Sequence, residues 1–186
     1  MGDVVRTVNV VHRREVAIDE RVADRVEPIL AIETHMSPEE RMLLLKTAMG
    51  LRSGFIACEI GSYLGASASL LALAASVLDG SVHCVDTWDN RAMSVEPERD
   101  TYEEFRRNTD PFARWITMHR GESIAVASQV PAPLDLLFID GDHSYDGAKA
   151  DLDHYAPKLR AGGLLLMHDF PRPEVERACA DYLAGR

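Results

Sequence analysis

Short apolar runs alternate with longer helical patterns along the chain from residue 37 onward. Each run is apolar at nearly every position and does not alternate with polar residues, which is typical of strands covered on both faces. Strands that alternate with helices form parallel sheets through right-handed crossovers, and ligands bind at the carboxyl ends of those strands. We therefore predict an α/β fold, a doubly wound, mainly parallel Rossmann-like sheet of about five strands with helices on both faces. The expected strands are 55–60, 82–85, 115–118, 134–139 and 164–167, and the expected helices are 38–51, 65–78, 97–109, 122–128, 146–159 and 173–183.

The two ends of this pattern need separate interpretation. Gly162 and Gly163 predict a turn before the last strand. Upstream of the alternating region, the valine-rich residues 4–11 predict an edge strand and residues 18–32 predict a helix. We divide the chain into an N-terminal extension over 1–36, expected to be a cap or an oligomer contact, and a main domain over 37–186.

Composition limits the partners of the chain. Its 186 residues carry a formal net charge of -10, whereas a protein that neutralises phosphates needs a basic face, so we expect no nucleic-acid partner. No apolar run approaches the ~20 residues of a membrane span, and residues 1–20 lack the unbroken apolar stretch of a signal peptide. The three cysteines are scattered along the chain, which fits a reducing compartment. We expect a cytoplasmic protein that acts on a small molecule.

Acidic residues end every expected strand except the third. They are Glu59, Asp86, Asp140 and Asp169. Acids are disfavoured within strands, and each of these lies where an open α/β sheet binds its ligand. Acids at four strand ends predict a site that recognises hydroxyl groups, cationic nitrogen or a metal ion.

The loop after the first strand carries two glycines. Gly61 allows a sharp turn against a ligand and Gly65 opens the next helix, although many such loops only turn the chain. The glycine spacing differs from the dinucleotide fingerprint G-x-G-x-x-G. In addition, Glu59 would repel a pyrophosphate, whereas it suits the ammonium group of an amino acid. A nicotinamide-dependent oxidoreductase is therefore disfavoured.

Two later positions suit an adenosine group. Asp86 lies about 20 residues beyond the glycine loop, where an acid accepts both hydroxyls of a ribose. Trp88 either stacks on the adenine or is a core aromatic. The segment 121–123, Gly-Glu-Ser, either frames the edge of the adenine or is a plain helix cap.

Five segments occur in the order E-I-G-S-Y-L-G-A-S, V-D-T-W, H-R-G-E-S, F-I-D-G-D-H-S-Y-D-G and G-G-L-L-L-M-H-D-F. Together they resemble the class I S-adenosylmethionine (SAM)-dependent methyltransferases, and within them the antibiotic and polysaccharide sugar O-methyltransferases, with macrocin-type and cephalosporin hydroxylase/methyltransferase relatives. The resemblance covers 37–170, and I-D-G-D-H-S-Y is its most specific part. It implies SAM as the cofactor. The expected cofactor contacts are Glu59, Gly61, Ser62, Tyr63, Gly65, Ser67, Asp86, Thr87, Trp88, Glu122, Ser123 and Asp140.

The same resemblance implies the residues that carry the chemistry. Asp140 and Asp169 would be ligands of a divalent metal, with His168 where those enzymes often offer a further carboxylate, and His143 would be the general base. A sugar or alcohol hydroxyl is a poor nucleophile at neutral pH. Mg²⁺ would lower the pKa of that hydroxyl, and the base would take its proton. The expected reaction is methyl transfer to a hydroxyl of a small molecule, a sugar or a natural product.

Two other functions stay open. One is a metal-independent methyltransferase with a nitrogen or sulfur acceptor, and the other is a non-catalytic SAM-binding protein. The second follows from the C-terminus, because class I methyltransferases usually end with an antiparallel hairpin beside strand five and this sequence offers one helix there. The strand over 164–167 would then be an uncovered apolar edge. We expect a homodimer partner or the valine-rich segment to cover it.

Overall fold

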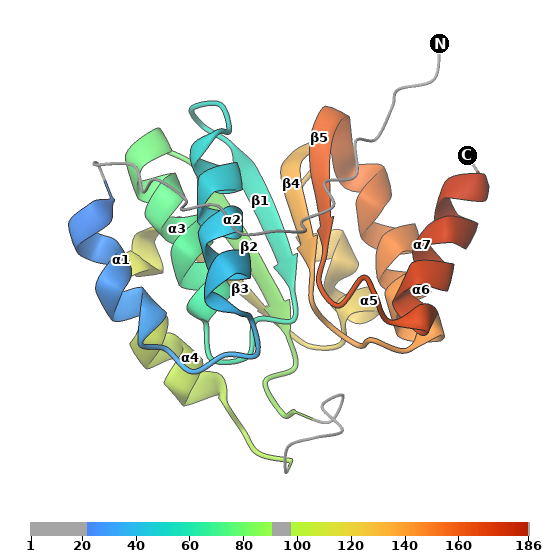
Figure 1. Ribbon diagram of the computed structural model, residues 1–186, viewed down its shortest axis with the longest axis horizontal. Helices are drawn as coiled ribbons and strands as arrows, with labels where there is room; N and C mark the ends of the chain where they lie inside the picture. The colour runs from blue at the N-terminus through green and yellow to red at the C-terminus, as the bar shows by residue number, and fades with distance from the viewer. Residues whose placement is uncertain (1–21, 91–97, 186) are drawn as a thin grey trace.

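The computed structural model describes residues 22–90 and 98–185, and it confirms the predicted α/β fold. Five parallel strands form one sheet in the order β3-β2-β1-β4-β5 (Figure 1). The strands are β1 (Ile56–Ile60), β2 (Ser81–Asp86), β3 (Ile116–Arg120), β4 (Leu134–Ile139) and β5 (Leu159–Met167). The strand order reverses between β1 and β4, which is where a doubly wound sheet leaves a crevice for its ligand.

Helices cover both faces of the sheet, as predicted. Figure 1 shows α1 to α4 on one side of the sheet and α5 to α7 on the other. Their bounds are α1 (Ala23–Leu30), α2 (Pro38–Met49), α3 (Ala66–Leu78), α4 (Tyr102–Thr109), α5 (Ser123–Val126), α6 (Tyr145–Tyr155) and α7 (Pro173–Ala184). Short 3-10 helices follow α4, α5 and α6, at 110–115, 127–129 and 156–158.

The central strands alternate between two hydrophobic cores. In β1, Ala57 packs in the core that contains α1 to α4, and the next residue, Cys58, packs in the core that contains α5 to α7. Every residue of β4 is buried. Because successive side chains of a strand point to opposite faces, a strand covered on both sides is apolar at most positions, and the one acid within β4, Asp135, forms ion pairs with Arg52 and Arg160. This double burial explains why these strands were clear in the sequence.

Two helix starts show how far local signals determine the boundaries. Helix α2 begins with a capping box, in which the Ser37 hydroxyl accepts from the Glu40 N–H and the Glu40 carboxylate accepts from the Ser37 N–H. Its predicted start is confirmed. Helix α4 was expected from residue 97 but begins at Tyr102. Residues 91–97 lie outside the described part of the chain.

The last strand differs from its prediction. We expected a turn at Gly162 and Gly163 and a strand from Leu164, but β5 already begins at Leu159 and contains both glycines. The register against β4 shifts between Leu134 and Leu136, so the glycines lie in a bulge of the strand. A bulge tolerates a left-handed glycine, and Gly162 has φ +74°. Gly162 thus adopts the left-handed backbone that its turn signal predicted, but the strand does not end there and continues through both glycines.

The N-terminal part of the chain joins the main core. Val22, Val26 and Ile29 are at most 3% exposed and pack in the same core as α2 and α3. Helix α1 lies inside the expected helical range 18–32. The predicted valine-rich strand lies outside the described residues. The division of the chain at residue 36 therefore stays a prediction.

The outer edge of β5 has no partner strand among the described residues. Coverage of this edge by a second copy of the chain or by the valine-rich segment stays a prediction. None of the described helices combines the length and the apolar composition that crossing a membrane requires.

Candidate active site

The acidic residues predicted at the strand ends lie along one edge of the sheet. The strands are in register there, because Ile60 of β1 pairs with Val85 of β2 on one side and with Ile139 of β4 on the other. Ile139 in turn pairs with Met167 of β5. The loops that follow these four strands therefore start side by side, and they carry most of the predicted site residues.

The glycine loop between β1 and α3 lies directly against the loop after β4. Gly61 has φ +83°, and a Cβ there would overlap the Asp140 carbonyl oxygen and lie 2.9 Å from the Gly141 Cα. The Gly61 N–H donates to the Val85 carbonyl at 2.9 Å. Only glycine permits this approach together with this φ. Gly65, with φ +88°, occupies the N-cap position of α3. The glycine loop and the loop after β4 are thus in direct backbone contact at Gly61 and Asp140.

Asp86 fixes the shape of the glycine loop. Its Oδ2 accepts from the N–H groups of Ser62 at 2.7 Å and Tyr63 at 2.8 Å, and its Oδ1 accepts from the N–H of Trp88 at 2.6 Å. Burial raises the pKa of Asp86, and the three donors oppose that rise. The carboxylate therefore organises the loop of the predicted methionine site from the end of β2. Contact with a ribose stays a prediction.

Tyr63, in the same loop, is a non-glycine residue with φ +45°. Its ring lies 5.7 Å from that of His35, and its hydroxyl accepts from Arg99 at 3.4 Å. The adopted backbone is one that non-glycine side chains rarely use, and such strain is found preferentially at functional sites. These contacts link the glycine loop to the segment before α2 and to the segment before α4.

Glu59 is fully buried under the loop. Its side chain is 0% exposed, it accepts from the Ser62 hydroxyl at 2.6 Å, and its Oε1 has no hydrogen-bond partner among the described residues. Burial raises the pKa of Glu59 to about 7, the hydroxyls of Ser62 and Ser67 lower it, and Asp140 and Asp86 raise it further. The predicted contact with the cofactor's ammonium group stays a prediction, and the contacts of the carboxylate in this structure are with the hydroxyls of Ser62 in the loop and Ser67 in α3.

The Glu59 carboxylate makes stability depend on pH. A raised folded-state pKa means that the folded chain binds this proton more tightly than the unfolded chain. Stability is therefore full below the ordinary glutamate pKa of 4.5 and falls as the pH rises to about 7. The loss amounts to about 3 kcal/mol. We expect Glu59→Gln to raise the melting temperature at pH 8 by about 5–10 °C and to leave it nearly unchanged at pH 4, in scanning calorimetry. Equal shifts at the two pH values would contradict this.

The structure corrects the prediction for Trp88. Its side chain is 0% exposed, and its ring packs on Phe105 at 4.8 Å and on Tyr102 at 5.3 Å between ring centroids. It is a core aromatic that attaches α4 to the sheet, so its ring does not face the site. Its neighbour Thr87 donates to Asp89 at 2.8 Å and remains at the rim. The sequence left both interpretations of the tryptophan open, because burial of a single aromatic has no local signature.

The predicted adenine segment follows β3. Glu122 occupies the N-cap position of α5 without a side-chain cap, and Ser123 begins the helix. Ser123 is held from α6: its hydroxyl donates to Asp151 at 2.5 Å, and its carbonyl accepts from the Tyr155 hydroxyl at 2.6 Å. The residues Asp151, Asp153 and His154 lie close together on α6 but differ in burial. Asp153 and His154 are exposed, but Asp151 is 3% exposed.

The burial of Asp151 had a signal that sequence reasoning missed. The buried residues of α6 are Ala148, Asp151, Leu152 and Tyr155. Their spacing of three, one and three residues is the stripe of a helix that packs on a core. An acid inside such a stripe has a partner in the interior, and here the partner is Ser123.

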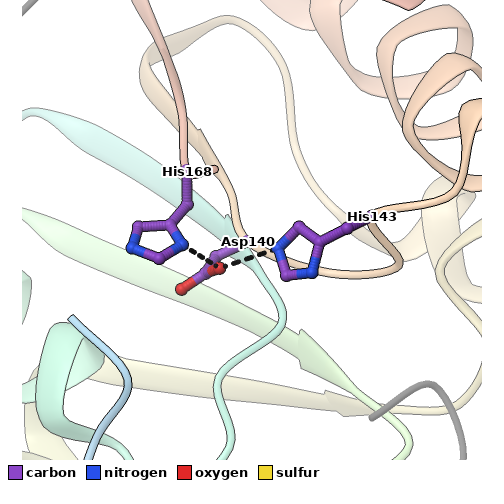
Figure 2. Close-up of side chains that lie close together, drawn as sticks. All are labelled: Asp140, His143 and His168. Carbon is purple, nitrogen blue, oxygen red and sulfur yellow. Dashed lines mark hydrogen bonds and ion pairs between the residues drawn. The ribbon is translucent and has the colours of Figure 1, made fainter. Parts of the chain in front are cut away.

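Asp140 lies between two imidazoles that approach it from opposite sides (Figure 2). Its Oδ1 is 3.3 Å from Nε2 of His143 and 2.9 Å from Nδ1 of His168. Donor atoms of the three residues lie within 4.8 Å of one another. Burial raises the pKa of Asp140, and the two histidines lower it more, so that the carboxyl stays ionised. The resemblance placed a base and a metal ligand beside Asp140, and the structure brings these side chains together.

Asp169 lies at the border of this group. Its Oδ2 is 3.6 Å from Nε2 of His143, and its Oδ1 is 3.7 Å from Nδ1 of His168. The same carboxylate forms an ion pair with Arg172 at 3.1 Å. Both predicted metal carboxylates therefore face the same two imidazoles, although one of them also has a competing cation.

His168 is the most enclosed residue of the group. Its side chain is 9% exposed, and Glu40 at the start of α2 lies 3.7 Å from its Nε2. The Asp140 contact is short but poorly aligned, so both ring nitrogens are without a hydrogen-bond partner among the described residues. Burial lowers the pKa of His168, but Asp140, Asp169 and Glu40 raise it to about 9. Sequence reasoning did not place Glu40 here, since nothing local indicates that α2 reaches this strand end.

A five-stranded parallel sheet that reverses between β1 and β4, with a glycine loop over acids at the strand ends, defines the class I methyltransferase architecture. Residues 58–170 match the sequence profile of the family described as "Methyltransferase domain". The chain belongs to this family. The match to a methyltransferase family agrees with the resemblance noted in the sequence.

Several solved structures share the fold. Cofactor-bound Rv0187 from MTB is 19% identical, with coverage of 91% of this chain and 78% of that one and a TM-score of 0.65. The O-methyltransferase from Bacillus cereus in complex with SAH is 16% identical, with coverage of 91% and 80% and a TM-score of 0.64. CalS11, a TDP-rhamnose 3'-O-methyltransferase of calicheamicin biosynthesis, is 15% identical, with coverage of 87% and 76% and a TM-score of 0.58. At these identities the likeness concerns the fold.

Among curated proteins, "Uncharacterized protein y4gI" of Sinorhizobium fredii (strain NBRC 101917 / NGR234) is 26% identical over 114 residues. The match covers 60% of this chain and 12% of that protein. The chain therefore corresponds to a small part of this relative.

Proposed function

We propose that this methyltransferase transfers the methyl group of SAM to a hydroxyl of a small molecule, with His143 as the general base. The observation that carries the proposal is the position of His143 beside Asp140, at the point where the glycine loop touches the loop after β4. The names of structural neighbours support a hydroxyl acceptor, since they include several O-methyltransferases and one that acts on TDP-rhamnose. A sugar or a related hydroxylated natural product is the acceptor class we favour.

The geometry supports a division of labour between the loops. Methyl transfer is an in-line displacement at a sulfonium, which is already a good electrophile, so the protein must supply alignment and a deprotonated acceptor. The glycine loop, shaped by Asp86, would hold the methionine end of SAM. His143 is 28% exposed at its side chain, against 9% for His168. His143 is therefore the imidazole that an acceptor can reach.

The atom of His143 that takes the proton follows from its contacts. Its interactions with described residues involve Nε2, which faces Asp140 and Asp169. An Nε2–H donated to these carboxylates leaves Nδ1 as the basic nitrogen. In this arrangement Asp140 orients the base.

The residues around Asp140 fit a divalent metal. The Asp140 and Asp169 carboxylates lie 2.9 Å and 3.7 Å from Nδ1 of His168, a buried imidazole whose nitrogens lack hydrogen-bond partners among the described residues. The metal would be held by Asp140, Asp169 and His168, and when bound it would lower the pKa of the acceptor hydroxyl. Mg²⁺ prefers an environment of oxygen ligands alone, and this donor set includes an imidazole. Such a set also suits Mn²⁺, Fe²⁺, Co²⁺ or Zn²⁺. We therefore propose that a divalent metal binds at Asp140, and the metal titrations described below identify which ion it is.

One observation favours a metal-independent methyltransferase instead. The raised pKa of His168, to about 9, makes this residue a cation at neutral pH, and the cation already compensates the charge of Asp140. A metal would have to displace that proton. Without a metal, His143 alone would activate the acceptor, and nitrogen or sulfur acceptors would then suit the site as well as a hydroxyl.

Calorimetric titration with S-adenosylhomocysteine tests the cofactor and the metal together. We expect micromolar binding that Asp86→Ala abolishes, because the variant removes the acceptor for three loop N–H groups. Separate titrations with Mg²⁺, Mn²⁺ and Zn²⁺ should give metal-dependent heat that Asp140→Asn removes. Methyl transfer to a panel of sugar nucleotides and phenols, measured as S-adenosylhomocysteine release, then identifies the acceptor class.

The outcomes separate the alternatives. Activity that survives exhaustive chelation would exclude the metal and favour the metal-independent reaction. Cofactor binding without turnover on any acceptor class would favour a non-catalytic SAM-binding protein. Activity restricted to amine or thiol acceptors would contradict the proposed O-methyltransferase.

A further inference from the structure

Helix α6 holds the segment after β3 at two points. Asp151 and Tyr155 are four residues apart, so they lie on the same face of the helix. Asp151 accepts from the Ser123 hydroxyl at 2.5 Å, and the Tyr155 hydroxyl donates to the Ser123 carbonyl at 2.6 Å. Helix α5 has four residues, which is too short to hold its own position. The place of Ser123 at the edge of the site is therefore set by α6.

The Asp151 carboxylate also touches the loop after β4. A Cβ on Gly141 would lie 3.3 Å from the Asp151 Oδ2 and 3.3 Å from the Ile60 Cγ2. Gly141 directly follows Asp140, whose carbonyl oxygen faces Gly61. One buried side chain thus lies between the loop that contains Ser123 and the loop that contains Asp140 and His143.

This arrangement has a cost in stability. Asp151 is 3% exposed and forms no ion pair with any described residue. Burial raises its pKa to about 6. Asp142 and Glu122 from the two adjoining loops raise it further, whereas Ser123 and His154 lower it. Cys58 on β1 also faces this carboxylate. An asparagine or an apolar residue would fill the same space without this cost, and residues kept against stability are found mainly at functional sites.

We propose that Asp151, together with Tyr155, is a positioning residue that holds Ser123 against the adenine end of the bound cofactor and fixes it relative to the loop of the proposed base. The inference rests on the proposed place of Ser123 at the adenine edge. It assigns to α6 a role in cofactor affinity, in addition to its packing against α7 and β4. Asp151 itself does not touch the cofactor in this arrangement.

The first test measures cofactor affinity in matched variants by calorimetric titration with S-adenosylhomocysteine. We expect Asp151→Ala and Tyr155→Phe each to raise the Kd about 10- to 100-fold, because each releases one of the two contacts to Ser123. Asp151→Asn keeps an acceptor for the Ser123 hydroxyl, and its Kd should stay within about threefold of the wild-type value. Asp153→Asn is the control, since Asp153 is exposed on the same helix and pairs with Lys149.

Two further readouts separate positioning from simple packing. The KM for SAM should rise in Asp151→Ala while kcat at saturating SAM stays near the wild-type value. Asp151→Asn should raise the melting temperature at pH 8 and leave it nearly unchanged at a pH below 3.8, because the folded chain binds the Asp151 proton more tightly than the unfolded chain and the resulting loss of stability begins only above the ordinary aspartate pKa of 3.8. A residue that acts in packing alone would lower the melting temperature at both pH values.

The pair can also be tested by a double-mutant cycle. The Kd of Ser123→Ala combined with Asp151→Ala should equal that of the weaker-binding single variant, because both remove the same contact. Wild-type Kd in Asp151→Ala, additive effects in the cycle, or a Kd that rises only in proportion to unfolded protein would overturn the inference. Absence of S-adenosylhomocysteine binding by the wild-type chain would instead overturn the cofactor site on which it rests.

Discussion

The Gly61→Ala variant is expected to lose cofactor binding, with the Kd for S-adenosylhomocysteine raised more than about 100-fold and the free energy of unfolding lowered by about 3 kcal/mol or more. Gly61 has φ +83°, and a Cβ would overlap the carbonyl oxygen of Asp140. Both partners of this contact are backbone, so no side chain can rotate away. The glycine loop must then move off the loop after β4, and the shape that Asp86 imposes on it is lost. Calorimetric titration and urea unfolding give the two values.

Gly54→Ala is the matched control for this variant. Gly54 also has a left-handed backbone, with φ +69°, but a Cβ there meets nothing within 4 Å. Gly54→Ala therefore measures only the cost of placing a Cβ on a left-handed backbone, which lowers the free energy of unfolding by about 1 kcal/mol. We expect it to bind S-adenosylhomocysteine normally. Similar behaviour of the two variants would mean that the close approach of the two loops is not needed for the site.

The parts of the fold that sequence analysis predicted well are those that the core determines. Strand β4 was expected over 134–139 and is found there, because a strand buried on both faces is apolar at nearly every position, and its one acid, Asp135, is paired with Arg52 and Arg160. The acids that end β1, β2 and β4 interrupt such runs, so they mark both the strand ends and the site. Resemblance then supplied the cofactor, which composition alone did not.

The parts that were missed depend on contacts between distant segments. The glycines of β5 predicted a turn, but pairing with β4 on one side turns the same local conformation into a bulge. The ring of Trp88 is buried because α4 folds over it, and no neighbour of the tryptophan in sequence indicates this. Glu40 reaches His168 from a helix 128 positions earlier in the chain. The local sequence pattern carries no information about contacts between residues so far apart in the chain.

The site combines buried carboxylates with few compensating cations. Glu59 and Asp151 both have pKa values raised chiefly by burial, and they lie under the two ends of the proposed cofactor site. Their ionisation costs stability that packing elsewhere must offset. A site arranged in this way favours a ligand with positive charge, and SAM carries both a sulfonium and an ammonium group. We therefore expect the cationic SAM to bind more tightly relative to neutral analogues as the pH rises through the pKa of Glu59, which lies under the loop proposed to hold the methionine end.

The His143→Gln variant is expected to lower kcat about 100- to 10,000-fold while the Kd for S-adenosylhomocysteine stays within about threefold. Glutamine can keep a donor toward Asp140 and Asp169, but it has no basic nitrogen to take the acceptor's proton. His154→Gln is the control, since His154 is exposed on α6, where its ring contacts the carbonyl of Ala150, and it lies in no part of the proposed site. Initial rates at saturating SAM and acceptor give kcat, and calorimetry gives the Kd. A kcat within about threefold of wild type would place the base elsewhere. Loss of cofactor binding would mean that His143 shapes the cofactor site rather than activating the acceptor.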